Sequence, residues 1–424
     1  MASKIILCPF CFEKFNNTDA LYQCENDDTN ADGSQRCERV SYPEYNQYWG
    51  LNDFIHYTWP QKSGLMLRLM GPKLKEVRCP QCGYRSLRFV CPHCYNCIPE
   101  EMVKNGGQII SVIGSPSSGK TNYIISLIHE LQENGHKVDL QVQPSQTHRD
   151  GDRLDSTQNR FTNFENKLFE KRRVLDKTEV DTTDNPWIFR LSQRYTNQEI
   201  YLVFYDTAGE RFNENLKNQV KYLRESSGII LLLDTLGISH VSDVLEKEGL
   251  ENLGGKVRDG LLNIFTAIGN LSKDIRENLY SKPAAIVMSK FDAVLDHSDK
   301  LEFNTDEFKR GNRRVGSSYL ETGKVDFDKI DAISQAIETA LLGPWESGKL
   351  VQAAREWTSQ KNRSLPFAQQ DMNDPDNNYK FFGVSALGGM PDDTLQLSKV
   401  APYRVMDPLL WVLRKLGQFN IPSK

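Results

Sequence analysis

The stretch that decides the fold is Gly114-Ser115-Pro116-Ser117-Ser118-Gly119-Lys120-Thr121. A short β-branched run, Ile109–Ile113, precedes it, and apolar residues recur at helical spacing from Tyr123 to Leu131 after it. The pattern GxxxxGK[ST] between a strand and a helix is typical of a phosphate-binding loop, because backbone N–H groups of the turn and of the helix N-terminus surround phosphate oxygens. The sequence therefore predicts a nucleoside triphosphate site, in which Lys120 reaches the β- and γ-phosphates and the Thr121 hydroxyl binds Mg²⁺.

Further strands are predicted after this loop, and three of them end in polar residues. Glu199–Tyr205 leads into Asp206-Thr207-Ala208-Gly209, Ala284–Met288 leads into Ser289-Lys290-Phe291-Asp292, and Lys380–Val384 leads into Ser385-Ala386-Leu387. Ile229–Leu233 is a continuous apolar run of the kind that is buried in parallel sheets. These segments predict an α/β fold, a three-layer P-loop domain whose mostly parallel sheet has helices on both faces. The polar residues are expected at its ligand-binding edge.

With the motifs GSPSSGKT, DTAGE, SKFD and SAL in this order, the chain resembles P-loop GTPases of the translation-factor-related class, which includes the Ras-like small GTPases. The resemblance implies that Asp206 holds Mg²⁺ and that the Gly209 N–H senses the γ-phosphate. It also implies that Asp292 accepts hydrogen bonds from guanine N1 and N2, and that Lys290 packs along the base. The backbone of Ala386, between Ser385 and Leu387, would meet guanine O6. The implied reaction is Mg²⁺-dependent attack of water on the γ-phosphate.

Two residues depart from the family pattern. Ser289 stands where the family has Asn, so a contact that braces the phosphate-binding loop is expected to be lost. Glu210 stands where Ras-like proteins have Gln, and repulsion between its carboxylate and the γ-phosphate predicts slow hydrolysis. The threonine that would complete the Mg²⁺ site is assigned to Thr183, 23 residues ahead of Asp206, with Thr182 and Thr178 as alternatives.

All nine cysteines lie before Gly106, and three Cys-x2-Cys pairs occur among them. A two-residue spacer lets one tight turn present two thiolates to the same Zn²⁺ ion. The sequence predicts two zinc sites, which are formed by Cys8, Cys11, Cys24, Cys37, Cys79, Cys82, Cys91 and Cys94. This region is expected to be a small zinc-binding, ribbon-like unit with a structural role.

Two groupings of the eight thiols are compatible with the spacing. In the first, the pairs at 79/82 and 91/94 share one ion and Cys8, Cys11, Cys24 and Cys37 hold the other. In the second, Cys8 and Cys11 meet a later pair across the intervening residues. Cys97 or His93 could replace a thiolate in either grouping. The stretch from Lys62 to Val90 contains seven Lys or Arg residues and one Glu. Nucleic-acid binding is therefore an alternative role for this region.

Length and composition set the remaining expectations. The 424 residues are divided into a Cys-rich zinc-binding region, 1–104, and a P-loop GTPase domain, 105–424, with insertions at about 141–185 and 293–378. With a net charge of −4, the chain does not have the overall positive potential expected of a protein that coats nucleic acid. No apolar run approaches the ~20 residues of a membrane span, and the three-residue apolar run Ile5–Leu7 near the N-terminus is far too short for a signal-peptide core. The expected location is the cytoplasm.

These features together predict a GTP-controlled molecular switch that hydrolyses GTP slowly without a partner. A protein partner would bind through the polar segment 141–185 or through the zinc region. The alternatives are a non-hydrolysing GTP-binding scaffold, an ATPase, and a zinc-region nucleic-acid sensor that the nucleotide controls. A Cys-rich region joined to such a domain is also similar to GTPase-like proteins of bacterial conflict or defence systems.

Overall fold

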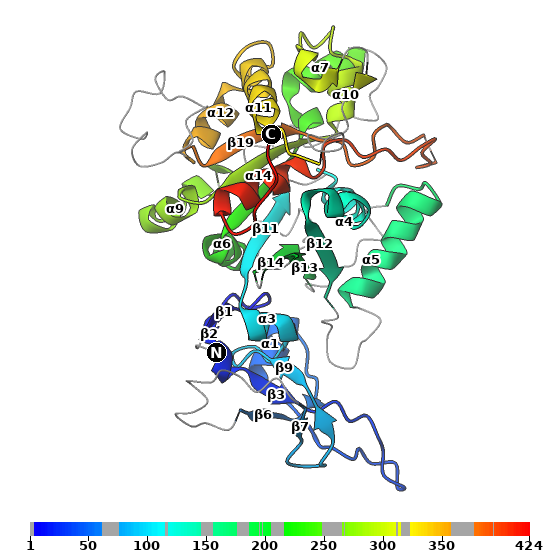
Figure 1. Ribbon diagram of the computed structural model, residues 1–424, viewed down its shortest axis with the longest axis vertical. Helices are drawn as coiled ribbons and strands as arrows, with labels where there is room; N and C mark the ends of the chain where they lie inside the picture. The colour runs from blue at the N-terminus through cyan, green and yellow to red at the C-terminus, as the bar shows by residue number, and fades with distance from the viewer. Residues whose placement is uncertain are drawn as a thin grey trace. The chain divides into compact units, whose positions relative to one another are not determined.

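The computed structural model describes residues 4–61, 76–114, 118–145, 156–175, 186–194, 196, 198–204, 216–247, 265–266, 268–310, 313–314, 323–357, 377–392 and 394–424. The chain divides into two compact units. The first comprises Met1–Ile109, Gln143–Thr162 and Thr183–Tyr205, and the second comprises Ile110–Val142, Asn163–Thr182 and Asp206–Lys424. Figure 1 labels their helices and strands.

The described part of the first unit begins with short strands and short helices. They are β1 (Ile5–Leu7), β2 (Lys14–Asn16), β3 (Leu21–Gln23), β4 (Arg39–Val40), α1 (Pro43–Trp49), β5 (Ile55–His56), β6 (Thr58–Pro60), β7 (Val77–Arg78), β8 (Arg85–Ser86), β9 (Arg88–Val90), β10 (Cys97–Ile98) and α3 (Glu100–Asn105). Strands β10, β9, β3 and β6 form an antiparallel sheet in this order. Its core is aromatic, since the Tyr22 ring lies 5.0 Å from that of Phe89 and 5.8 Å from that of Trp59.

The same unit contains the antiparallel pair β13 (Trp187–Gln193) and β14 (Glu199–Phe204). The buried Glu199 carboxylate accepts hydrogen bonds from Tyr201 Oη at 2.7 Å and from Asn105 Nδ2, at the end of α3, at 3.0 Å. A Cβ on Gly107 would lie 2.4 Å from the Tyr201 ring, so the chain after α3 runs directly against this strand. Polar and close-packed contacts therefore join α3 to β14.

The second unit contains most of the sheet and its helices. Its elements include β11 (Gln108–Gly114), α4 (Lys120–Asn134), β12 (Leu140–Pro144), α6 (Leu216–Glu225), β15 (Gly228–Asp234), α7 (Ser239–Lys247), α9 (Lys273–Tyr280), β16 (Ala284–Ser289), α10 (Phe291–Asp296), β17 (Lys309–Arg310), β18 (Arg313–Arg314), α11 (Phe327–Leu342), α12 (Gly348–Arg355), β19 (Tyr379–Gly383) and α14 (Asp407–Leu416). The seven-stranded sheet has the order β12-β13-β14-β11-β15-β16-β19. Strands β11, β15, β16 and β19 are parallel.

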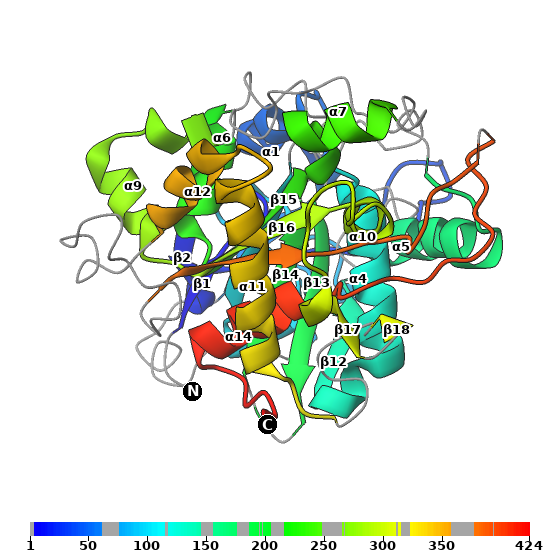
Figure 2. The ribbon, with the colours of Figure 1, turned by 90° about the horizontal axis from the view of Figure 1, so that it is seen from above.

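Helices cover both faces of these parallel strands. A Cβ on Gly228 of β15 would meet Val412 of α14 and Ile110 of β11, which places Ile110 on the α14 face. The Tyr222 hydroxyl of α6 accepts a hydrogen bond from the Val112 N–H at 3.2 Å and lies near the Ser111 side chain, and adjacent strand residues point to opposite faces. Figure 2 shows α11 and α14 side by side, and both contribute to the surroundings of Phe382. The predicted three-layer α/β architecture is confirmed.

Most of the expected strands and helices lie close to those of the structure, but β12 (Leu140–Pro144) begins a segment that is expected to be an insertion, and one helix differs. A single helix is expected over Gln158–Arg173, whereas the structure has α5 (Thr157–Glu165) followed by a five-residue π-helix, Asn166–Glu170. Inside this π-turn Leu168 is fully buried. The wider turn is consistent with a helix that must bring one apolar side chain inward from a mostly polar sequence.

Candidate functional site

The phosphate-binding loop joins the end of β11 to the start of α4. Gly119 caps the helix in the left-handed conformation, with φ of 70°, which strains any residue with a Cβ. A Cβ on Gly114 would lie 2.5 Å from Ser118 Oγ, so both motif glycines are required by the backbone path. Ser118 Oγ is buried and has no hydrogen-bond partner among the described residues. An unpartnered hydroxyl beside a helix N-terminus that starts at Lys120 and Thr121 fits an anionic ligand.

Several predicted site residues lie outside the described residues. In the phosphate-binding loop these are Ser115, Pro116 and Ser117. The DTAGE residues Asp206, Gly209 and Glu210, and the threonines 178, 182 and 183, also lie outside them. Their assignments therefore stay predictions.

The SKFD motif forms the turn between β16 and α10. Lys290 lies between the two elements in a left-handed conformation, with φ of 55°. Asp292 is buried in the first turn of α10. The Ser289 hydroxyl donates to the carbonyl of Leu233 in the neighbouring strand β15, at 2.9 Å. This contact connects the motif to β15, in keeping with a serine too short to reach the phosphate-binding loop.

The SAL motif follows β19 and forms a tight turn. Ser385 pairs with Tyr403 through two backbone hydrogen bonds, and its Oγ accepts one from the Gly388 N–H at 2.8 Å. The Ser126 hydroxyl of α4 donates to the Ala386 carbonyl at 2.7 Å. The Leu387 carbonyl accepts a hydrogen bond from the Ala401 N–H. The structure thus ties the turn directly to the helix that follows the phosphate-binding loop.

Replacing Ser126 with Ala is expected to weaken GTP binding about fivefold, because one buried hydrogen bond contributes roughly 1 kcal/mol and here positions the Ala386 backbone. Titration of a fluorescent guanine nucleotide measures the change. Ser272→Ala is the matched control, since Ser272 is exposed and makes no capping bond to α9. Equal affinities for wild type and Ser126→Ala would contradict the positioning role.

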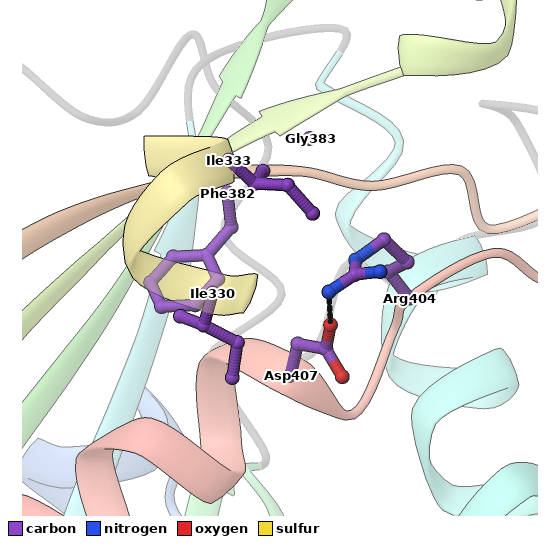
Figure 3. A pocket seen from close by; sticks show the side chains of 6 residues that line it. All are labelled: Ile330, Ile333, Phe382, Gly383, Arg404 and Asp407. Carbon is purple, nitrogen blue, oxygen red and sulfur yellow. Dashed lines mark ion pairs between the residues drawn. The ribbon is translucent and has the colours of Figure 1, made fainter. Parts of the chain in front are cut away.

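A small hollow lies behind the SAL turn, where α11 and α14 meet β19 (Figure 3). It is lined by Ile330, Ile333, Phe382, Gly383, Arg404 and Asp407. Arg404 Nη2 and Asp407 Oδ2 approach to 2.6 Å, and both side chains are almost fully buried. The contact lies outside hydrogen-bond angles, and Arg404 Nη1 has no hydrogen-bond partner among the described residues. A buried ion pair therefore lies directly after Tyr403, the residue that pairs with Ser385.

The three motifs share one edge of the sheet. Gly114, Ser289 and Val384 lie at the carboxyl ends of parallel strands β11, β16 and β19, or directly after them. Open α/β sheets bind their ligands at this edge. The structure therefore brings together the described parts of the phosphate-binding loop, SKFD and SAL, which lie about 90 to 270 residues apart along the chain.

Eight cysteine thiols form two clusters in the first unit. Cys8, Cys11, Cys91 and Cys94 make one, Cys24, Cys37, Cys79 and Cys82 make the other, and within each cluster all Sγ atoms lie within 4.8 Å of one another. The Sγ atoms of Cys8 and Cys94 are 3.7 Å apart, as are those of Cys37 and Cys79. Ligands of a tetrahedral zinc site with ~2.3 Å bonds are separated by about 3.8 Å, so both clusters fit Zn²⁺.

The structure decides between the two sequence-based groupings. The pairs at 79/82 and 91/94 do not share a site, so the first grouping was wrong. Cys8 and Cys11 instead meet Cys91 and Cys94, and the second cluster is nested between them in the sequence. The hairpins explain this, because the thiols at 79/82 lie between β7 and β8, whereas those at 91/94 lie between β9 and β10. Cys97 and His93 belong to neither cluster.

Burial makes three of these thiols, those of Cys8, Cys24 and Cys94, poor anions by themselves. It raises the pKa of Cys24 to about 12, and it raises the pKa values of Cys8 and Cys94 well above the ordinary range. A thiol must lose its proton to bind a metal ion, and a dication in the cluster provides the compensating charge. The clusters are therefore suited to hold a cation permanently.

Comparison with protein families identifies the nucleotide-binding part. The family model described as Double-GTPase 2 matches residues 108–341, which is more than half of the chain. The chain belongs to the Double-GTPase 2 family. The match includes β11, α4 and the SKFD motif. It ends before the SAL motif and begins after the cysteines, and the two thiol clusters add a zinc-ribbon-like region to this P-loop GTPase.

Two individual proteins are similar to this Double-GTPase 2 chain. One, from Mycolicibacterium smegmatis, is named "Putative ESX-1 scaffolding and assembly protein SaeC" and is 23% identical over 375 residues, covering 85% of this chain and 87% of the relative. The other is the crystal structure of the S. cerevisiae Ski7 GTPase-like domain, bound to GTP, with 11% identity and a TM-score of 0.32. That comparison covers 74% of this chain and 51% of the Ski7 chain, so it spans about half of the solved chain.

Among the described residues, no helix is both long and apolar enough to cross a membrane.

Within this Double-GTPase 2 chain, sequence reasoning missed three residues that hold the motifs in place. They are Ser126, Asp234 and Arg404. Only Asp234 could have been recognised in the sequence, because it is an acidic residue at the end of an otherwise apolar strand. Ser126 acts through a contact between residues 260 positions apart, which no local pattern reveals, whereas Arg404 pairs with Asp407 three residues later.

Proposed function

We propose that this protein binds GTP with Mg²⁺ and hydrolyses it slowly, as a nucleotide-controlled molecular switch. The observation that carries the proposal is the convergence of a phosphate-binding loop and a buried carboxylate, Asp292, at one edge of a parallel sheet. A carboxylate can accept two hydrogen bonds from the N1 and N2 donors of guanine. Adenine has no such pair of donors, so this arrangement favours GTP over ATP.

The proposed chemistry is stabilisation of charge on the phosphates. Lys120 and the loop N–H groups would hold the β- and γ-phosphate oxygens, and Gly209 would contact the γ-phosphate. Thr121, Asp206 and Thr183 would hold Mg²⁺, which neutralises phosphate charge when bound. Glu210 would orient the attacking water poorly, because its charge repels the γ-phosphate, and slow turnover follows.

Asp292→Asn is expected to reduce the preference for GTP over ATP on the order of 10- to 100-fold, because two hydrogen bonds to a charged acceptor are disturbed. Competition of unlabelled GTP and ATP against a fluorescent guanine nucleotide, with Mg²⁺, measures the preference. Asp296→Asn is the matched control, since it makes the same charge change at the exposed end of α10. The base-reading role is wrong if the variant keeps its preference, and the GTPase proposal is wrong if wild type prefers ATP.

A second candidate function is a scaffold that binds GTP and scarcely hydrolyses it. The name of the M. smegmatis relative, a scaffolding and assembly protein, favours this candidate and suggests protein partners. Single-turnover hydrolysis separates the two, because turnover of bound GTP without any partner excludes a pure scaffold. A partner protein that accelerates turnover would support the switch.

For the Cys-rich region we propose two structural Zn²⁺ ions and a role in partner binding. We also retain residues 1–104 and 105–424 as the proposed domains, with insertions at about 141–185 and 293–378. Each four-thiolate site would carry a net charge near −2, which disfavours a nucleic-acid surface and favours a protein partner.

A further inference from the structure

The turn that carries Asp292 is held by the end of the neighbouring strand. Lys290 Nζ donates to Asp234 Oδ2 at 2.8 Å, and the other carboxylate oxygen, Oδ1, accepts from the Leu236 N–H at 3.1 Å. The Asp234 side chain is 7% exposed, against 34% for Lys290. The buried Asp234 carboxylate is a rigid partner because both of its oxygens accept hydrogen bonds. It therefore fixes the position of the more exposed Lys290 ammonium.

Two hydroxyl contacts join the same two strand ends. The Thr235 hydroxyl donates to the Ser289 carbonyl at 2.5 Å, and the Ser289 hydroxyl donates to the Leu233 carbonyl at 2.9 Å. Asp234 and Ser289 are also direct partners in the parallel register of β15 and β16. Three consecutive residues of β15 and its continuation therefore contact Ser289 or Lys290.

The backbone at Lys290 needs this support. A lysine with φ of 55° lies in the left-handed region, which is unfavourable for residues with a Cβ, and helix α10 begins at the next residue. The direction in which α10 starts, and with it the position of the Asp292 carboxylate, depends on that conformation. The side-chain ion pair at Lys290 opposes relaxation to an ordinary backbone geometry.

We propose that Asp234 is a positioning residue for guanine recognition, acting through Lys290 on Asp292. The inference rests on the proposed function, because it explains how the base-reading carboxylate is held. Asp234 and Thr235 replace the brace that an Asn at position 289 would give. The SKFD turn is held laterally by β15.

Asp234→Asn is expected to weaken GTP binding about tenfold and ITP binding about threefold, because ITP keeps the N1–H donor and so loses one of the two hydrogen bonds. ITP lacks the exocyclic amino group of guanine, so a displaced Asp292 carboxylate costs it less. Competition against a fluorescent guanine nucleotide gives both affinities for the full chain. Asp243→Asn, on the exposed side of α7, makes the same charge change and is expected to alter neither. An equal loss for GTP and ITP would indicate general damage to the site and would overturn the proposal, as would unchanged affinities.

A double-mutant cycle tests the route through Asp292. In an Asp292→Asn background, Asp234→Asn is expected to change GTP affinity less than twofold, and a full tenfold loss there would overturn the proposal. If Asp234→Asn does not fold, Thr235→Val removes only the hydroxyl contact to Ser289 and should produce a smaller loss with the same GTP bias. Failure of wild type to prefer GTP overturns the proposed function, whereas wild-type preference with an unaffected Asp234→Asn variant overturns this inference alone.

Discussion

Replacing Cys94 with Ser is expected to reduce bound zinc from two ions per chain to one. Cys94 is almost fully buried, and its Sγ lies 3.7 Å from that of Cys8. Serine is a poor zinc ligand, and a three-thiolate remnant in a buried cluster holds the ion weakly. Structural zinc supplies on the order of 10–16 kcal/mol of apparent binding free energy, which is folding free energy for a small unit of short strands.

Metal analysis of the purified protein and thermal unfolding measure the effect. Cys97→Ser is the matched control, because Cys97 is close in the sequence and lies outside both clusters. We expect this control to retain two ions and the wild-type transition, whereas Cys94→Ser should unfold at a lower temperature. Two ions in Cys94→Ser, or one in Cys97→Ser, would contradict the observed grouping.

Asp407→Ala is expected to lower the free energy of unfolding by about 3–5 kcal/mol. It removes the partner of a buried guanidinium and leaves the Arg404 charge without compensation in a hollow lined by Ile330, Ile333 and Phe382. Arg404→Met combined with Asp407→Leu removes both charges and should recover most of the loss, because an apolar pair of similar size suits the same hollow.

Chemical denaturation gives the free energies for the two variants and for a matched surface control. In the control, Asp28→Ala breaks the ion pair of Asp28 with Arg36, whose side chains are 62% and 60% exposed, and the expected loss is below about 1 kcal/mol. A loss for Asp407→Ala as small as that of the control would show that the buried pair does not stabilise the fold.

Local patterns in the sequence predicted most of the fold. Strands such as Ile229–Leu233 and Ala284–Met288 are continuous apolar runs, and burial on both faces of a parallel sheet demands that composition. The order of motifs along the chain then places them at one sheet edge, since every parallel strand presents its carboxyl end there.

Residues that act across long separations were not predictable. The pairing of Cys8 and Cys11 with the thiols at 91/94 depends on which hairpins pack together, and the spacing of the cysteines is equally compatible with a ribbon made of the last two pairs. The bond from Ser126 to Ala386 likewise depends on how α4 lies beside the SAL turn. Asp234 was visible only as the last residue of a strand, because nothing local links it to Lys290, 56 residues later.

The contacts between α3 and β14 have a consequence for how the chain is made. Translation completes the last thiol ligand, Cys94, before β11 is synthesised, so metal loading can finish early on the ribosome. The partners of Asn105 and Gly107 come from Glu199 and Tyr201, about 95 residues later. At roughly 5–20 residues per second, the nascent chain exposes that side of α3 for some 5–20 seconds. We expect this surface to be open to chaperones of nascent chains during that interval, before the strand arrives.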